Sequence, residues 1–214
     1  MSEAPVVVHR RLAPEDQARA DFYALLARLF ADAPDAGLLA AIAGAKPLAP
    51  ARQPDLGSDA GVGLPAAWDA LRAASAAMDA GAASEEFQTL FTGVGRSEVS
   101  LYASHYLGPQ SGRPLAEIRA ALAELGLARR PGSSEYEDHI AALLETMRML
   151  VAGDGERRPA ELARQRTFFD RHVASWVFAC CAAIEQSPVA IYYRRVAQFS
   201  ACFLALERDS LAMD

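Results

Sequence analysis

Four residues near the middle of the chain could bind a cation: Glu135, Glu137, Asp138 and His139 are almost adjacent. Carboxylates pair with arginine side chains, and imidazole changes its charge near neutral pH. Acidic residues in the first turn of a helix also complement the helix dipole, and that alone would account for them. Two interpretations therefore stay open from the spacing: a helix N-terminus, or the polar mouth of a binding pocket.

The histidines do not have the spacing of metal ligands. His9, His105, His139 and His172 are scattered, and neither an E-x-x-H nor an H-E-x-x-H pair occurs. Helical bundles that hold two iron ions take such pairs from facing helices. We therefore expect no metal ion and no cofactor in this protein.

Two further stretches combine aromatic and polar side chains. Tyr102, Ser104 and Tyr106 belong to a dense run at 101–107, and His172 and Trp176 share a helical stripe with two phenylalanines. Such a stripe is usually core, so the plain interpretation of His172 is a buried histidine that bonds a carbonyl.

Catalytic motifs of the common kinds are missing from the sequence. It has no phosphate-binding G-x-x-x-x-G-K-[ST] and no nucleophile elbow. Gly93-Val94-Gly95 follows a helical pattern rather than a strand, so it predicts a loop and not a dinucleotide site. We expect a protein that is not an enzyme.

The elements that must position these residues are predicted to be helices, because apolar residues recur at helical spacing and no segment alternates like a strand. This pattern indicates an all-α, single-domain bundle of about nine or ten helices over residues 1–214. An irregular loop is expected at 46–64 and a possible hinge at 108–114. Helices are predicted at 14–31, after Pro34, from Pro65, from Ser84, at 114–125, from Ser134 to near Gly153, at 159–186 and at 188–208.

Several helix ends carry their own signals. Ser84 is expected to begin a helix with Glu85 and Glu86 in its first turn. Ser134 and Glu137 fit a capping box. Asp138 and His139 would then lie at the exposed end of that helix, beside the loop that carries Tyr102 and Tyr106.

Charge and composition exclude several classes of protein. The net charge is −6, which disfavours a nucleic-acid binder and favours a basic partner. The longest strongly apolar stretch, 176–184, is far shorter than the ~20 residues that span a bilayer, and no secretory segment is visible. We expect a cytoplasmic protein whose three cysteines, Cys180, Cys181 and Cys202, are reduced and buried.

Three motifs in order resemble the TorD/DmsD/NarJ family of molybdoenzyme maturation chaperones. The first is Glu86-Phe87-x-x-Leu90-Phe91-x-Gly93-x-Gly95, followed by Leu101-Tyr102-x-Ser104-x-Tyr106; the second is Glu135-x-x-Asp138-His139-Ile140; the third is Phe169-x-x-His172-x-x-x-Trp176. The resemblance runs from about Asp21 to Trp176.

The resemblance implies a chaperone for a molybdenum or tungsten oxidoreductase. Its partners would be the twin-arginine signal peptide and the apo form of the catalytic subunit, and it would be a monomer or a domain-swapped homodimer. The peptide-binding residues so implied are Tyr102, Ser104, Tyr106, Glu135, Asp138, His139, His172 and Trp176.

Other functions remain as alternatives. The chain could assist a non-exported subunit by acting on the enzyme body rather than on a leader. Guanine-nucleotide hydrolysis would need a phosphate loop, which is missing, and an α-helical transcription regulator would need a basic recognition helix. The helix around Leu38 to Ile42 carries neither arginine nor lysine.

Overall fold

The structure of the chain is a computed structural model, and it describes residues 12–49, 63–93, 97–108, 114–128, 136–154 and 157–213. In these ranges every regular element is helical, apart from one isolated β-bridge. The all-α, single-domain bundle predicted from the sequence is therefore confirmed. Most of the loop predicted at 46–64 and of the hinge predicted at 108–114 falls outside the described residues.

The first part of the chain forms four α-helices and a π-helical turn. They are α1 (Pro14–Ala31), α2 (Ala36–Gly44), α3 (Leu64–Ala77), α4 (Ala80–Phe87) and η1 (Gln88–Thr92). The second part contains α5 (Ala103–Leu107), α6 (Pro114–Glu124), α7 (Ile140–Ala152), α8 (Leu162–Phe168), η3 (Phe169–Ala174), α9 (Val177–Gln186) and α10 (Tyr192–Met213).

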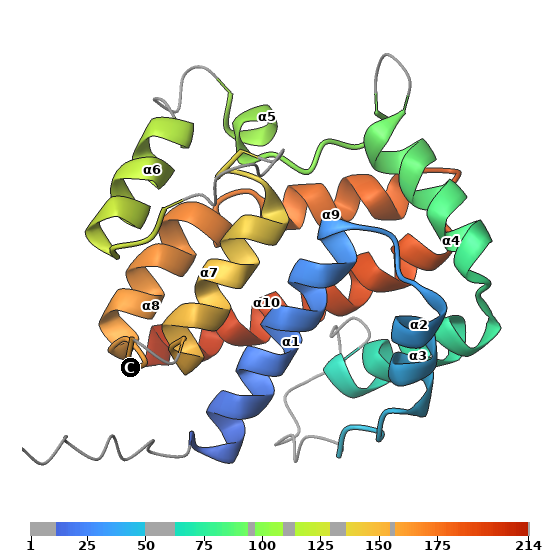
Figure 1. Cartoon of the computed structure of the whole chain (residues 1–214), viewed down its shortest axis with the longest axis horizontal. Coiled ribbons are helices and arrows are strands. Elements are labelled where there is room, and N and C mark those ends of the chain that lie inside the picture. The colour runs from blue at the N-terminus through green and yellow to red at the C-terminus, as the bar shows by residue number, and fades with distance from the viewer. Residues whose placement is uncertain are drawn as a thin grey trace, which may run out of the picture.

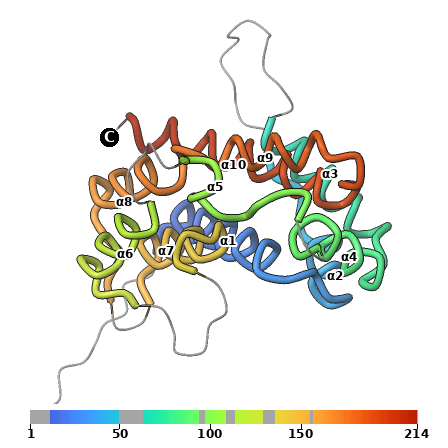
Figure 2. The backbone as a smooth tube through the Cα atoms, turned by 90° about the horizontal axis from the view of Figure 1, so that it is seen from above, coloured from blue at the N-terminus to red at the C-terminus, as the bar shows by residue number. Residues whose placement is uncertain are grey.

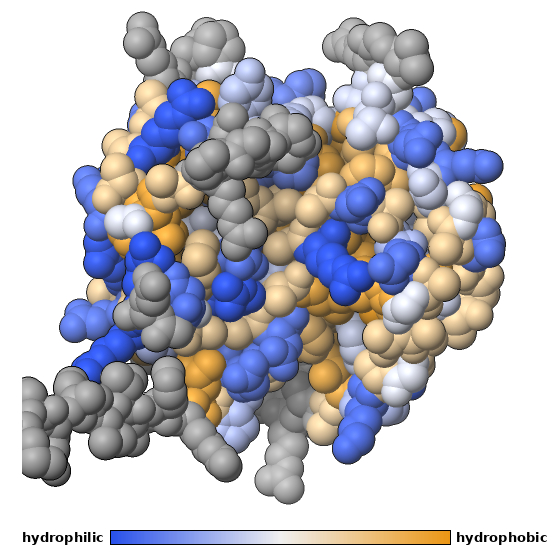
Figure 3. All heavy atoms as spheres, in the orientation of Figure 1, coloured by the Kyte–Doolittle hydropathy of each residue, from blue (hydrophilic) through white to orange (hydrophobic). Residues whose placement is uncertain are grey.

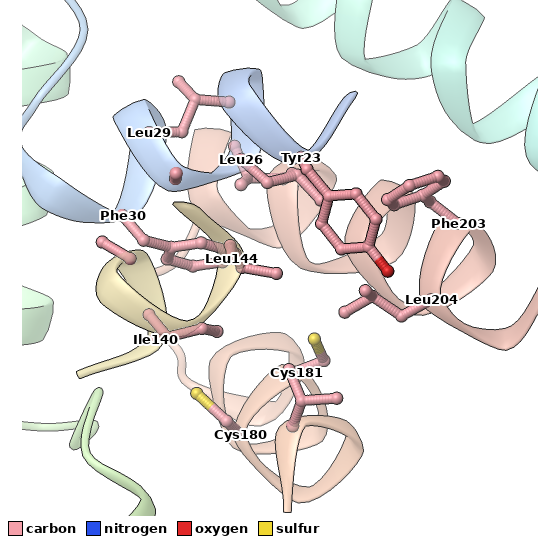
Figure 4. Packing of buried hydrophobic residues seen from close by; sticks show 14 of the residues in the cluster. Tyr23, Leu26, Leu29, Phe30, Ile140, Leu144, Cys180, Cys181, Phe203 and Leu204 are labelled. Atoms are coloured by element: carbon pink, nitrogen blue, oxygen red, sulfur yellow. The ribbon is translucent and has the colours of Figure 1, made fainter. Parts of the chain in front are cut away.

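Helices α1 and α7 form the most extensive helix pair, and α10 and α9 lie beside them (Figure 1). The apolar stripe of α1 faces inward, as its helical spacing predicts. Figure 4 shows Leu26 and Phe30 of α1 packed toward Leu144 of α7, with Phe203 of α10 next to Tyr23. This core is a continuous cluster of fully buried side chains.

The remaining helices cover the two ends of this centre. Helices α2, α3 and α4 lie at one end, and α6 and α8 lie at the other, in both the front view and the view from above (Figures 1 and 2). The short helix α5 packs against α6 and α9. The chain therefore places the 101–107 segment on the outside of the bundle, near the α6 end.

A buried ion pair joins the N-terminal and C-terminal helices. The guanidinium of Arg19 donates to both carboxylate oxygens of Glu207, at 2.8 and 3.0 Å, and to Oε1 of Gln165 at 3.0 Å. The hydroxyl of Tyr23 donates to Glu207 Oε2 at 2.9 Å. Glu207 is only 3% exposed. Burial, helped by the negative charge of Glu207, raises the pKa of the Tyr23 hydroxyl well above its usual value.

Several predicted helix bounds are wrong. The helix expected at Ser84 begins at Ala80, because Asp79 accepts hydrogen bonds from the backbone N–H of Gly81 and Ala82 and is the true N-cap. Glu86 therefore lies near the helix end instead of in its first turn.

The helix expected from the Ser134 capping box begins at Ile140 instead. Residues 136–139 form a turn and a bridge, and Ser134 lies outside the described residues. The prediction of a single long helix at 159–186 is also wrong. The helical segment begins at Leu162, and it breaks at Trp176, whose φ of −146° and ψ of −23° are not helical.

None of the three cysteines forms a disulfide. Cys180 and Cys181 are buried as expected, whereas Cys202 is half-buried and the prediction of its burial is wrong. Burial raises the pKa of the Cys180 thiol to about 12 and that of Cys181 well above its usual value. Such thiols are poorly reactive at neutral pH. Across the described ranges, none of the helices combines the length and hydropathy that a transmembrane span requires.

Candidate functional site

The first and second motifs meet through a short antiparallel pairing. The N–H of Ala103 donates to the carbonyl of Asp138 at 3.0 Å, and the N–H of Ile140 donates to the carbonyl of Leu101 at 2.9 Å. Tyr102 and His139 are the bridged pair between these bonds. Residues 35 to 39 positions apart are thereby placed side by side at the start of both α5 and α7.

Asp138 lies beneath this pairing and is only 2% exposed. Its Oδ2 accepts the backbone N–H of Ser104 at 3.2 Å, whereas the N-cap residue of α5, Tyr102, makes no side-chain capping bond. Asp138 therefore caps α5 from a distant part of the chain. The expectation that Asp138 lies at an exposed helix end is wrong, because the bridge folds this segment under α5.

His139 is also buried, at 5% exposure, so the same expectation is wrong for it. Its Nδ1 accepts the N–H of Ala141 at 3.2 Å, which makes it the N-cap of α7. Its ring contacts Tyr102 edge to face, with the ring centroids 4.9 Å apart. His139 thus joins the beginning of α7 to the aromatic segment before α5.

The third motif meets the same segment through an aromatic stack. The rings of Tyr106 and Trp176 are stacked with centroids 5.5 Å apart and planes 25° apart. The Tyr106 hydroxyl donates to the carbonyl of Ser100 at 2.9 Å, and burial raises the pKa of this hydroxyl. The indole N–H of Trp176 donates to the carbonyl of His172 at 2.8 Å. The helix break at Trp176 is what turns its ring toward α5.

His172 packs against Phe168, with ring centroids 5.0 Å apart, and is 8% exposed. The predicted burial is confirmed, but the predicted bond is not: among the described residues the imidazole has no hydrogen-bond partner, and the carbonyl bond belongs to Trp176. Burial lowers the pKa of His172, and the negative charge of Glu117 offsets part of this effect.

Because the pKa of His172 is lowered, we expect the free energy of unfolding to decrease when the solution becomes mildly acidic. The pKa of His172 in the folded chain lies below the usual value of about 6.5. As the pH falls below that value, the unfolded chain binds more protons than the folded chain, and the free energy of unfolding decreases. Urea unfolding at about pH 7.5 and about pH 5.5 should show this loss, and His172→Gln should reduce it. His105→Gln, which alters an exposed histidine, is the control. An equal loss in the wild type and in His172→Gln would assign the effect to another group.

The face that remains accessible is the outer side of α5. Ser104 and His105 are exposed, Tyr102 and Tyr106 are half-buried, and Tyr136 is 53% exposed. His139, Asp138, His172 and Trp176 lie beneath and support this face. Glu135, the eighth predicted residue, lies outside the described residues. We call the accessible set of Ser104, His105, Tyr102, Tyr106 and Tyr136 the α5 face.

Carboxylates of α6 and of the second motif border the α5 face. Glu137 forms an ion pair with Arg119 at 3.1 Å and is largely buried, while Glu117 is exposed and close enough to His172 to act on its charge. Sequence reasoning had not selected Glu117, because nothing in its local pattern separates it from other surface glutamates on a helix. The fold alone brings it to this site.

Glu86 was placed correctly within the first motif, but its role was not predicted. Its carboxylate accepts the backbone N–H groups of Ile191, Tyr192 and Tyr193 at 2.8–3.0 Å, which caps the start of α10. The partners are more than 100 residues apart in the sequence, so no local signal could reveal them. This cap fixes the helix that leads into η1 and the 97–102 segment.

Two of the three motifs contain π-helical turns. η1 ends at Thr92, shortly before the 97–102 segment, and η3 ends two residues before Trp176. π-Helical turns are rare and are frequent at functional sites. In the ranges that the structure covers, no cluster of three or more histidine, cysteine or acidic side chains could hold a metal ion.

Comparison with known proteins identifies a family that this chain matches. A protein-family model described as "Nitrate reductase delta subunit" matches residues 59–182, which is more than half of the chain and contains all eight predicted site residues. No curated protein matches the chain.

Proposed function

Because the chain belongs to the nitrate reductase delta subunit family, whose members are molybdoenzyme maturation chaperones, we propose that it binds the twin-arginine signal peptide of a molybdenum or tungsten oxidoreductase subunit. In this proposal the protein is not an enzyme. It acts in the cytoplasm on the apo form of the catalytic subunit, before export, and assists insertion of the cofactor.

The observation that carries the proposal is the α5 face itself. Three sequence motifs that are far apart converge on one short helix and leave half-buried tyrosines open to a ligand. Tyrosine rings of this kind suit an apolar peptide segment. Glu117 at the border could pair with an arginine of the leader, and arginine forks pair well with carboxylates.

A leader peptide is expected to bind with micromolar or tighter affinity, and the binding should weaken with salt because part of it is charge pairing. Titration calorimetry tests this with the leader peptides of molybdoenzymes whose genes neighbour the gene of this chain. Ser104→Arg, on the exposed side of α5, should weaken binding at least several-fold by charge repulsion, while Ser104→Glu should not. A leader with its two arginines replaced by glutamines should bind weakly to all three proteins.

The alternative is a chaperone that acts on the enzyme body of a non-exported subunit. Binding of the apo subunit after removal of its leader, together with no heat from any leader, would favour that alternative. No binding to either partner would contradict both. Calorimetry with gel filtration of the mixtures distinguishes these outcomes, and gel filtration of the free protein also decides between a monomer and a domain-swapped homodimer.

A further inference from the structure

A second surface lies between α3 and the start of α10. A groove of ≈ 630 Å³ runs between these helices, a volume within the usual range of ligand-binding clefts. One wall is a row of alanines from Ala70 to Ala77, spaced by three and four residues along one face of α3. The other wall holds Ile191, Arg194 and Arg195.

This groove is apolar and open. Ile191 at its wall is 72% exposed, although a side chain of this type is usually buried. Alanine methyl groups let the backbone of another helix approach closely. The alanine row covers about two helical turns, or roughly 10 Å along the axis. Figure 3 shows that much of the surface over α2, α3 and α4, on the right, has the pale orange of weakly apolar residues.

The charge of the groove is opposite to that of the whole chain. The net charge is −6, yet the two charged side chains in the groove lining, Arg194 and Arg195, are both positive. Arg194 donates to the carbonyl of Ser187 at 3.0 Å, and Arg195 donates to the side-chain amide of Gln198 at 2.8 Å. Neither arginine is in an ion pair among the described residues, and the buried Nε of Arg194 has no partner there.

A carboxylate of the chain already occupies this end of α10. Glu86 accepts the N–H groups of residues 191–193, so the helix N-terminus itself offers no further anion site. The two guanidinium groups remain for an external carboxylate. Charge-assisted bonds from arginine are stronger than neutral ones, and an apolar wall beside them strengthens the pairing further.

We propose that this groove binds an amphipathic helix of a partner protein, with small apolar residues against the alanine row and carboxylates against Arg194 and Arg195. A twin-arginine leader carries the wrong charge for it. Helix α3, which forms one wall of the groove, also lies at the end of the bundle with α2 and α4, away from α5 and α6 (Figure 1). The protein therefore offers two separate surfaces to different polypeptide segments: the α5 face with Glu117 at its border, and a groove that carries two arginines.

The test uses the full chain and two labelled helical peptides of alanine and leucine. One peptide carries glutamates along one flank, and the other carries glutamines at the same positions. Fluorescence anisotropy should show at least tenfold tighter binding of the glutamate peptide. Arg195→Glu should remove that preference, while Arg208→Glu, an exposed arginine at the far end of α10, should keep it. A lysine-flanked peptide should in turn bind Arg195→Glu better than it binds the wild type.

Three outcomes would overturn the proposal. The first is equal binding of the glutamate and glutamine peptides to the wild type. The second is displacement of the bound peptide by a twin-arginine leader, which would place both at one site. The third is a dimer in analytical ultracentrifugation that Ile191→Glu dissociates, because the occupant would then be a second copy of the chain. Thermal unfolding of Arg195→Glu and Ile191→Glu, both on exposed side chains, checks that the fold is retained.

Discussion

Replacing Glu207 with alanine is expected to lower the free energy of unfolding by about 3–5 kcal/mol, because it removes the buried counter-ion of a largely buried arginine. Arg19 would lose two charge-assisted bonds to the carboxylate and keep Gln165 and the more exposed Asp16. The Tyr23 hydroxyl would lose its acceptor as well. Urea unfolding followed by circular dichroism measures the change.

The matched control is a variant that removes the charges of Arg19 and Glu207 together. Arg19→Met with Glu207→Leu replaces both partners by apolar side chains of similar size, and Tyr23→Phe removes the remaining hydroxyl. Such a replacement of a buried ion pair is often nearly neutral, so most of the lost stability should return. Asp209→Ala, which breaks an exposed pair with Arg208, should cost no more than about 0.5 kcal/mol. A triple variant as unstable as Glu207→Ala would show that the network acts through shape rather than charge.

Local patterns predicted the helices of this chain well, since they depend on residues close in sequence. The boundaries of α1 agree with the sequence prediction because Pro14 and the apolar stripe are local signals. Glu207 and Arg19 could not be paired in advance, because 188 positions separate them and each looks like an ordinary surface charge. Their partnership depends on how α1 crosses α10.

The candidate site also combines features that could be predicted from the sequence with features that depend on contacts between distant residues. The family resemblance placed Tyr102, Tyr106 and Trp176 in one peptide site, and in the structure the ring of Tyr106 stacks on that of Trp176. The exposure of Asp138 and His139 was predicted wrongly, because the capping box suggested a helix start where the chain makes a bridge to residues 101–102. A non-local backbone pairing has no periodicity by which a sequence could reveal it.

Replacing Asp138 with alanine is expected to lower the free energy of unfolding by about 2 kcal/mol and to weaken leader binding roughly tenfold or more. The stability is lost because a buried acceptor disappears and the N–H of Ser104 is left without its bond. Since Asp138 is buried, we propose that it affects binding as a positioning residue that holds α5 and its tyrosines in place. Asp138→Asn keeps an acceptor oxygen and should retain most of both properties.

The control for this effect is a cap of the same chemistry elsewhere in the fold. Asp79 accepts two backbone N–H bonds at the start of α4, and Asp79→Ala should lower stability by about 1 kcal/mol without changing leader binding. Thermal unfolding and peptide calorimetry are measured on each variant under conditions where the variant is fully folded. If folded Asp138→Ala binds the leader as tightly as the wild type, Asp138 is a structural cap alone. In that case the orientation of α5 does not control peptide binding, and the α5 face would no longer be supported as the site.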